Sequence, residues 1–288
     1  MNVTAAVAAP GIAREAILQH ARTLPASPQV LVGLVELLQD INTDLGEIST
    51  QIRVEPALAT RVIRMSNSAV FGVGQRVGSV DEAVNRVGFG EVLRLVGAAT
   101  VSGLVDRTLG CYGIAAGKLR ESLLLHALAS EALAAQTGID ERTAYSAGLL
   151  RATGMMVLDR VGRAQPASAE AFDPARFASY GEWETGRFGV ASTEVTAMIL
   201  DEWHFPAEVV AAQRAHLLLN PASHEDRLAC VLNLAGAIVA DKGLALPGEA
   251  VCWPPTAEKF AAARINEDQF QAAAAQATRM FERHRGAL

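Results

Sequence analysis

Apolar residues in this chain recur three and four positions apart, and they almost never alternate with polar residues. This spacing places apolar side chains on one face of a helix, whereas alternation would place them on one face of a strand. The segment 267–285 is typical, because Phe270, Ala273, Ala274, Ala277 and Phe281 share one face. About a dozen segments follow this pattern and none reads as a strand, so the sequence predicts an all-α fold.

Helix starts carry their own signals. Ser79 and Glu82 have the spacing of a capping box, in which each side chain accepts a hydrogen bond from a backbone N–H of the first turn. Asn266 and Gln269 repeat this spacing ahead of the last helix. Both pairs predict a helix that begins directly after the first residue.

A chain of 288 residues allows one large domain or two smaller ones. The glycine-containing segment 110–117 (GCYGIAAG) is the best internal boundary, and the proline-rich segment 246–256 (LPGEAVCWPPT) separates the final helices. We therefore expect a flexible N-terminus (1–12), an N-terminal helical subdomain (13–109), a second helical subdomain (110–245), and a C-terminal loop with helices (246–288) that packs on the second subdomain.

Charge and cysteine usage exclude several classes of protein. The net charge is −6, and no cluster of Lys or Arg is long enough to bind nucleic acid. The three cysteines, Cys111, Cys230 and Cys252, are far apart, which argues against a disulfide framework and a zinc site. The longest apolar run, 228–240, is shorter than the ~20 residues that a membrane span needs. No signal peptide is visible at the start, so we expect a cytoplasmic protein without membrane contact.

Common catalytic motifs are missing. Residues 72–78 (GVGQRVG) miss the dinucleotide fingerprint by one position and follow a predicted helix, so they read as a connector. His126 shares a helical face with leucines, which favours a buried, hydrogen-bonded histidine over a metal ligand. His204, His216 and His224 lack the spacing of paired ligands, which favours surface or structural roles.

A series of short segments, in order and at similar intervals, resembles the HDOD family, the HD-related output domains of bacterial signalling. The resemblance covers roughly residues 20–240. The segments are 24–28 (LPASP), 55–58 (EPAL), 61–69 (RVIRMSNSA), 71–72 (FG), 79–84 (SVDEAV), 87–88 (VG), 93–96 (LRLV), 147–150 (AGLL), 188–190 (FGV), 203–206 (WHFP) and His216. The resemblance implies that the second of the two packed helical subdomains is HD-like.

The family signature has a structural interpretation of its own. Its marker residues are Pro25, Pro56, Asn67, Ser68 and Gly88. Pro56 begins a helix, and the segment that contains Asn67 ends it. Asparagine tolerates the left-handed backbone conformation common at helix ends, and its amide can bond to the last turn. We therefore expect Asn67 to be a cap and not a catalytic residue.

Departures from the HD pattern decide the expected chemistry. The HD superfamily binds metal through a His, a His-Asp doublet and a later Asp. His126 matches the first position, but Arg151 and Ala152 stand at the doublet and Gly236 at the later Asp. Ser192 replaces a further family histidine. A guanidinium would repel a cation, so the resemblance implies a degenerate pocket marked by His126, Arg151 and His216, with no metal, no cofactor and no catalytic residue.

These inferences favour a non-catalytic signal-transduction module that acts by binding a partner protein, and partner contacts are expected within residues 20–107. Binding of a small ligand stays open, as do the partner's identity and the oligomeric state. The alternative is a metal-dependent HD-type phosphohydrolase that acts on a nucleotide. A third reading is a purely structural subunit of a regulatory complex.

Overall fold

The helical periodicity of the sequence recurs in the computed structural model, which describes residues 12–24, 29–40, 42–68, 71–72, 74–164 and 171–285. These residues form 15 α-helices and two short 3-10 helices. The β pairing found among them is a single bridge between Leu109 and Ile114. The prediction of an all-α fold is confirmed.

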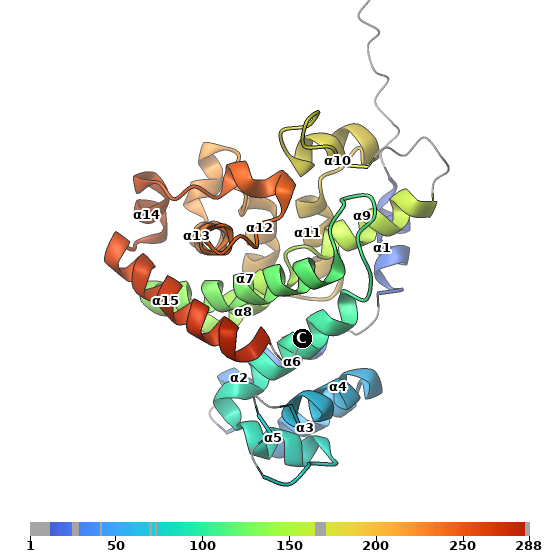
Figure 1. Ribbon diagram of the computed structural model, residues 1–288, viewed down its shortest axis with the longest axis vertical. Helices are drawn as coiled ribbons and strands as arrows, with labels where there is room; N and C mark the ends of the chain where they lie inside the picture. Colours follow the sequence, from blue (N-terminus) through green and yellow to red (C-terminus); the bar gives the residue numbers. More distant parts are fainter. Residues whose placement is uncertain are drawn as a thin grey trace, which may run out of the picture.

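The first six helices form the N-terminal part of the chain. Helices α2 to α5 lie below α6 in Figure 1, and α6 leads from them toward the second half of the molecule. Their bounds are α1 (Arg14–Ala21), α2 (Gln29–Gln39), α3 (Leu45–Arg53), α4 (Pro56–Ser66), α5 (Val80–Val87) and α6 (Phe89–Leu104).

The remaining helices surround α7, which is buried at every residue from Ser122 to Ala134. Helices α8, α13 and α15 pack directly on it, and α15 runs beside it in Figure 1. The bounds are α7 (Ala116–Thr137), α8 (Glu141–Leu150), α9 (Thr153–Ala164), α10 (Tyr180–Phe188), α11 (Ser192–Glu202), α12 (Ala207–Ala215), η1 (Pro221–Glu225), α13 (Arg227–Asp241), η2 (Pro247–Cys252), α14 (Ala257–Ala263) and α15 (Glu267–His284).

The proposed division of the chain at residues 110–117 stays a prediction. Helix α1 falls in the first proposed subdomain by sequence, yet it packs on α9 and α11 of the second. The connector itself is held in place, because the Cys111 N–H donates to the Asp159 carboxylate at 2.8 Å. One continuous set of buried apolar side chains then joins both halves.

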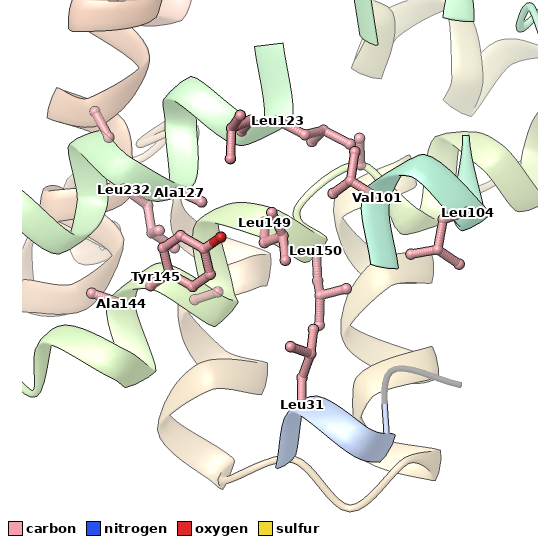
Figure 2. Packing of buried hydrophobic residues seen from close by; sticks show 14 of the residues in the cluster. Leu31, Val101, Leu104, Leu123, Ala127, Ala144, Tyr145, Leu149, Leu150 and Leu232 are labelled. Atoms are coloured by element: carbon pink, nitrogen blue, oxygen red, sulfur yellow. The ribbon is translucent and has the colours of Figure 1, made fainter. Parts of the chain in front are cut away.

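Figure 2 shows that continuity. Leu31 of α2 points toward Leu150 of α8, and Val101 and Leu104 of α6 lie on the other side of the same cluster. All four of these side chains are at most 3% exposed. The N-terminal helices are thus fixed to the second half through α2, α6 and α8.

The two predicted capping boxes have different outcomes. At the start of α15, Asn266 and Gln269 accept from each other's backbone N–H, as predicted. At the start of α5, Ser79 accepts from the Glu82 N–H, but the Glu82 carboxylate accepts from the Gly78 N–H at 2.7 Å. This second box was predicted wrongly, because the Glu82 side chain reaches one residue past the cap.

The signature residues lie at the ends of α4 and α5, except Pro25, which lies outside the described residues. Pro56 is the first residue of α4. The Ser68 carbonyl accepts from the Gly72 N–H at 2.6 Å and closes the following turn. Gly88 joins α5 to α6 with a φ of 77°, a conformation that favours glycine.

Asn67 ends α4 in a right-handed conformation, with φ −92° and ψ −1°, so the expected left-handed conformation is wrong. Its amide instead bridges two segments. The Nδ2 group donates to the carbonyls of Ile63 and Val77, both at 3.0 Å, and Oδ1 accepts from the Val77 N–H at 2.9 Å. The connector that leads to α5 is therefore tied to the end of α4, and a left-handed turn is not needed.

Candidate functional site

The three residues of the candidate pocket come from separate elements and meet around one indole ring. His126 lies in α7, Arg151 directly follows α8, and His216 directly follows α12. The Trp253 ring centroid lies 5.9 Å from that of His126 and 6.3 Å from that of His216. The Arg151 guanidinium carbon lies 5.5 Å from the same centroid. All four residues are at most 3% exposed, so the cluster is closed to solvent.

A buried ion pair neutralises the guanidinium. Arg151 Nη1 donates to both carboxylate oxygens of Glu249, at 2.8 and 2.9 Å. The side chains of the pair are 1% and 8% exposed. A buried charge needs such a partner, because the transfer of an ion from water into the protein interior costs several kcal/mol. Glu249 and Trp253 both belong to the segment around η2, which therefore holds Arg151 from two directions.

The indole ring also restricts the size of the side chain that position 236 can hold. A Cβ atom at Gly236 would lie 2.3 Å from Trp253 Cε3, a distance that real Cβ contacts do not reach. Gly236 is the position where the resemblance places a metal-binding carboxylate. Trp253 thus occupies the space that such a side chain would need.

Both histidines are neutral in this environment. Burial lowers the pKa of His126 well below its usual range, and the nearby Arg151 and His216 lower it further against a small backbone contribution from Leu232. Burial and the Arg151 charge lower the pKa of His216 to about 4. His216 Nδ1 lies 2.9 Å from the Gln213 carbonyl, which makes Nδ1 the donor.

Several buried polar atoms of this cluster lack a hydrogen bond of good geometry within the described part of the chain. They are both ring nitrogens of His126, Nε2 of His216, Nε of Arg151, Oε1 of Gln213 and Oδ1 of Asn233. The expected burial of His126 is correct. The polar group beside its ring is the backbone of Leu232, at a geometry short of a full hydrogen bond.

The other predicted positions lie elsewhere. Ser192 begins α11, where its N–H donates to the Glu184 carboxylate at 2.7 Å. His204 is exposed at the turn after α11, with a φ of 61°. His224 Nδ1 lies 2.8 Å from the Glu258 carboxylate. Met155 and Met156 are buried in the core.

Sequence reasoning missed Glu249 and Trp253. The available signal was an acidic and an aromatic residue in a proline-rich segment, 246–256, that would otherwise read as a surface loop. Nothing in their spacing relates them to Arg151, which precedes them by about a hundred positions in the chain. Only the tertiary structure places Glu249 beside Arg151 and Trp253 beside Gly236.

A divalent cation does not fit this arrangement. A metal site needs three or four converging anionic or neutral ligands, and here the two histidines and a guanidinium pack around an indole ring. The described residues also contain no group of three or more His, Cys, Asp or Glu side chains with metal-binding geometry. The side chains at this site thus do not fit the metal that catalytic members of the HD superfamily bind.

The model of the HDOD domain matches residues 24–218, about two thirds of the chain. The chain belongs to the HDOD family. The match includes His126, Arg151 and His216, whereas Glu249 and Trp253 lie beyond its end. Glu249 and Trp253, which pack against Arg151, therefore come from outside the segment that the family model matches.

Solved structures share the fold over nearly the whole chain. A candidate phosphohydrolase from Shewanella amazonensis SB2B is 23% identical, with a TM-score of 0.64 over 94% of this chain and 97% of its own. An HDOD domain protein of unknown function from Geobacter sulfurreducens is 16% identical, with a TM-score of 0.65 over 95% and 97%. A candidate signal transduction protein from Marinobacter aquaeolei VT8 is 19% identical, with a TM-score of 0.65 over 94% of this chain and 64% of its own.

At these identities the likeness shows the fold alone, including the HD-like arrangement of the second half. No curated protein matches this HDOD chain. Within the described residues, no helix combines the length and apolar character that crossing a bilayer requires.

Proposed function

We propose that this HDOD protein is a regulatory signal-transduction protein that acts by binding a partner protein and carries out no reaction at its HD-like site. The observation that supports this proposal is the occupation of that site by Trp253 and by the buried Arg151–Glu249 pair. A substrate phosphate and its metal ions would have to displace both. A chain without a catalytic centre influences a pathway only by favouring one state of what it binds.

The competing proposal is a metal-dependent phosphohydrolase, since the Shewanella relative is named a candidate phosphohydrolase. Such an enzyme needs a metal-bound water or hydroxide as its nucleophile. In this chain His126 and His216 are the two imidazoles that contact Trp253, and the Glu249 carboxylate beside that ring is already paired with Arg151. The residues present therefore support the regulatory proposal better.

Metal content and hydrolysis separate these two proposals. The purified full chain, incubated with Mn²⁺, Fe²⁺ or Mg²⁺ and then desalted, is expected to retain no stoichiometric metal by elemental analysis. It is expected not to hydrolyse bis-p-nitrophenyl phosphate or a cyclic dinucleotide. Stoichiometric metal together with hydrolysis that is lost in His126→Gln would establish the enzyme instead.

Partner binding is tested in the native cell. The full chain, crosslinked and captured from a deletion strain that it complements, is expected to bring down a signalling protein that a mock capture lacks. Arg151→Met combined with Glu249→Leu should still complement, because the proposal gives the buried pair no chemical role. Failure of this folded double variant, with surface variants silent, would contradict the proposal.

A further inference from the structure

A small cavity lies between the N-terminal helices and the second half of the chain. It has a volume of about 130 Å³ and lies where α2, α8 and the start of α12 meet. Its walls are mainly apolar, formed by Val32 and Val35 of α2, by Phe205, and by Val209 of α12. Small-molecule sites usually measure about 300–1,000 Å³, so this cavity suits one apolar side chain and not a cofactor.

One buried polar atom lines this cavity without a partner. Ser146 is 2% exposed, and its Oγ makes no hydrogen bond with any described residue. The other hydroxyl in the wall, on Thr143, already donates to Asp140 at 2.7 Å. The Ser146 Oγ is itself closed to solvent, so the surface that the cavity offers to an entering group is mainly its apolar wall.

Two carboxylates flank the apolar wall. Glu36 of α2 and Glu208 of α12 both line the cavity, and both residues are exposed. Neither forms an ion pair within the described ranges of the chain, whereas Glu202 and Glu194 of α11 pair with Arg22 and Arg214. An apolar hollow between unpaired negative charges is complementary to an apolar side chain between positive charges.

We propose that this cavity is the docking site for a partner protein segment in which one aliphatic residue is flanked on both sides by Lys or Arg. The aliphatic side chain fills the hollow between α2 and α12, and the basic residues pair with Glu36 and Glu208. The inference rests on the proposed function, since it names the chemistry of the partner. One buried anchor with a charged rim is the usual energetic pattern of a protein interface.

Peptide probes test the site without knowledge of the partner. The full chain is titrated into fluorescein-labelled peptides that contain Lys-Lys-Leu-Lys-Lys, Lys-Lys-Gly-Lys-Lys or Glu-Glu-Leu-Glu-Glu, and binding is followed by anisotropy. The first peptide should bind at least tenfold more tightly than either of the others. Equal binding of the leucine and glycine peptides would overturn the proposal, because attraction between net charges would then explain both.

Matched charge reversals locate the binding. Glu36→Lys with Glu208→Lys should weaken the leucine peptide at least tenfold. Glu15→Lys with Glu225→Lys changes the net charge equally at exposed positions outside the cavity and should weaken it less than threefold. Equal losses in the two double variants would overturn the assignment. A cell partner that binds the Glu36→Lys/Glu208→Lys chain undiminished would also refute this site while leaving the proposed function intact.

Discussion

Gly236 has a hydrogen atom where the HD resemblance places a carboxylate side chain, and the Trp253 ring lies against that hydrogen. Interiors of proteins are packed as closely as organic crystals, so a single added carbon is felt by its neighbours. The presence of Trp253 in the core therefore requires glycine at position 236. Together they convert a potential metal pocket into core.

Substitutions at these two positions should depend on each other. Gly236→Ala is expected to destabilise the fold by about 1–3 kcal/mol through overpacking, and Trp253→Ala by about 3–5 kcal/mol through a cavity. In a Trp253→Leu background the cost of Gly236→Ala should shrink, because the overlapping ring is gone. Urea unfolding followed by circular dichroism measures the free energy of unfolding of the native chain and of each variant.

Gly186→Ala is the matched control, since a Cβ atom there meets open space in α10. It should be neutral or stabilise by up to about 1 kcal/mol. If Gly236→Ala behaved like this control, the Trp253 ring would not lie against Gly236.

The end of helix α4 is tied to α5 through its C-cap residue. Asn67 bonds both to the final turn of α4 and to the connector at Val77. A backbone connector that has no regular structure has to satisfy its polar groups with side chains. Arg86 of α5 donates to Asn67 Oδ1 and to the Gln75 carbonyl of the connector, so the two helix ends are coupled through both side chains.

Asn67→Ala should lower the free energy of unfolding by about 1–3 kcal/mol, because the N–H and carbonyl of Val77 lose their partner. Asn85→Ala, at an exposed position of α5, is the control and should change stability by less than about 0.5 kcal/mol. Thermal and urea unfolding compare the two. A stable Asn67→Ala chain that no longer binds its partner would instead place Asn67 in a recognition surface.

The whole molecule should respond to acid through its buried histidines. The pKa of His216 is lowered to about 4, so protonation of this residue favours the unfolded chain. Its stabilising effect is present above the ordinary histidine pKa of about 6.5 and is lost as the pH falls toward 4, by an amount of order 3 kcal/mol. Glu131 and Glu184 act in the opposite direction, since burial raises the pKa of each carboxyl.

A comparison of variants isolates the contribution of His216. Between pH 6.5 and pH 4, the free energy of unfolding of His216→Gln should fall less steeply than that of the native chain. His204→Gln, at an exposed turn, should keep the native slope. Identical slopes in all three proteins would show that His216 is not held neutral by burial.

Much of the fold was accessible from the sequence alone because the relevant signals are local. Helical periodicity, the Asn266–Gln269 cap and the helix that begins at Pro56 depend on residues within a few positions of each other. The family segments added the HD-like character of the second half. The convergence of His126, Arg151 and His216 also followed from this likeness, as an expectation that no backbone periodicity could have supplied.

Tertiary packing alone decided what those three side chains meet. Glu249 and Trp253 come from a proline-rich segment near the C-terminal end of the chain, and only the tertiary fold brings them to Arg151 and Gly236. The docking cavity has the same origin, since α2, α8 and α12 each contribute part of its wall. Local pattern determines which segments become helices and which face of each is apolar. The pairing of those faces depends on shape and buried charge summed over the whole core, which is why the closed site appears only in three dimensions.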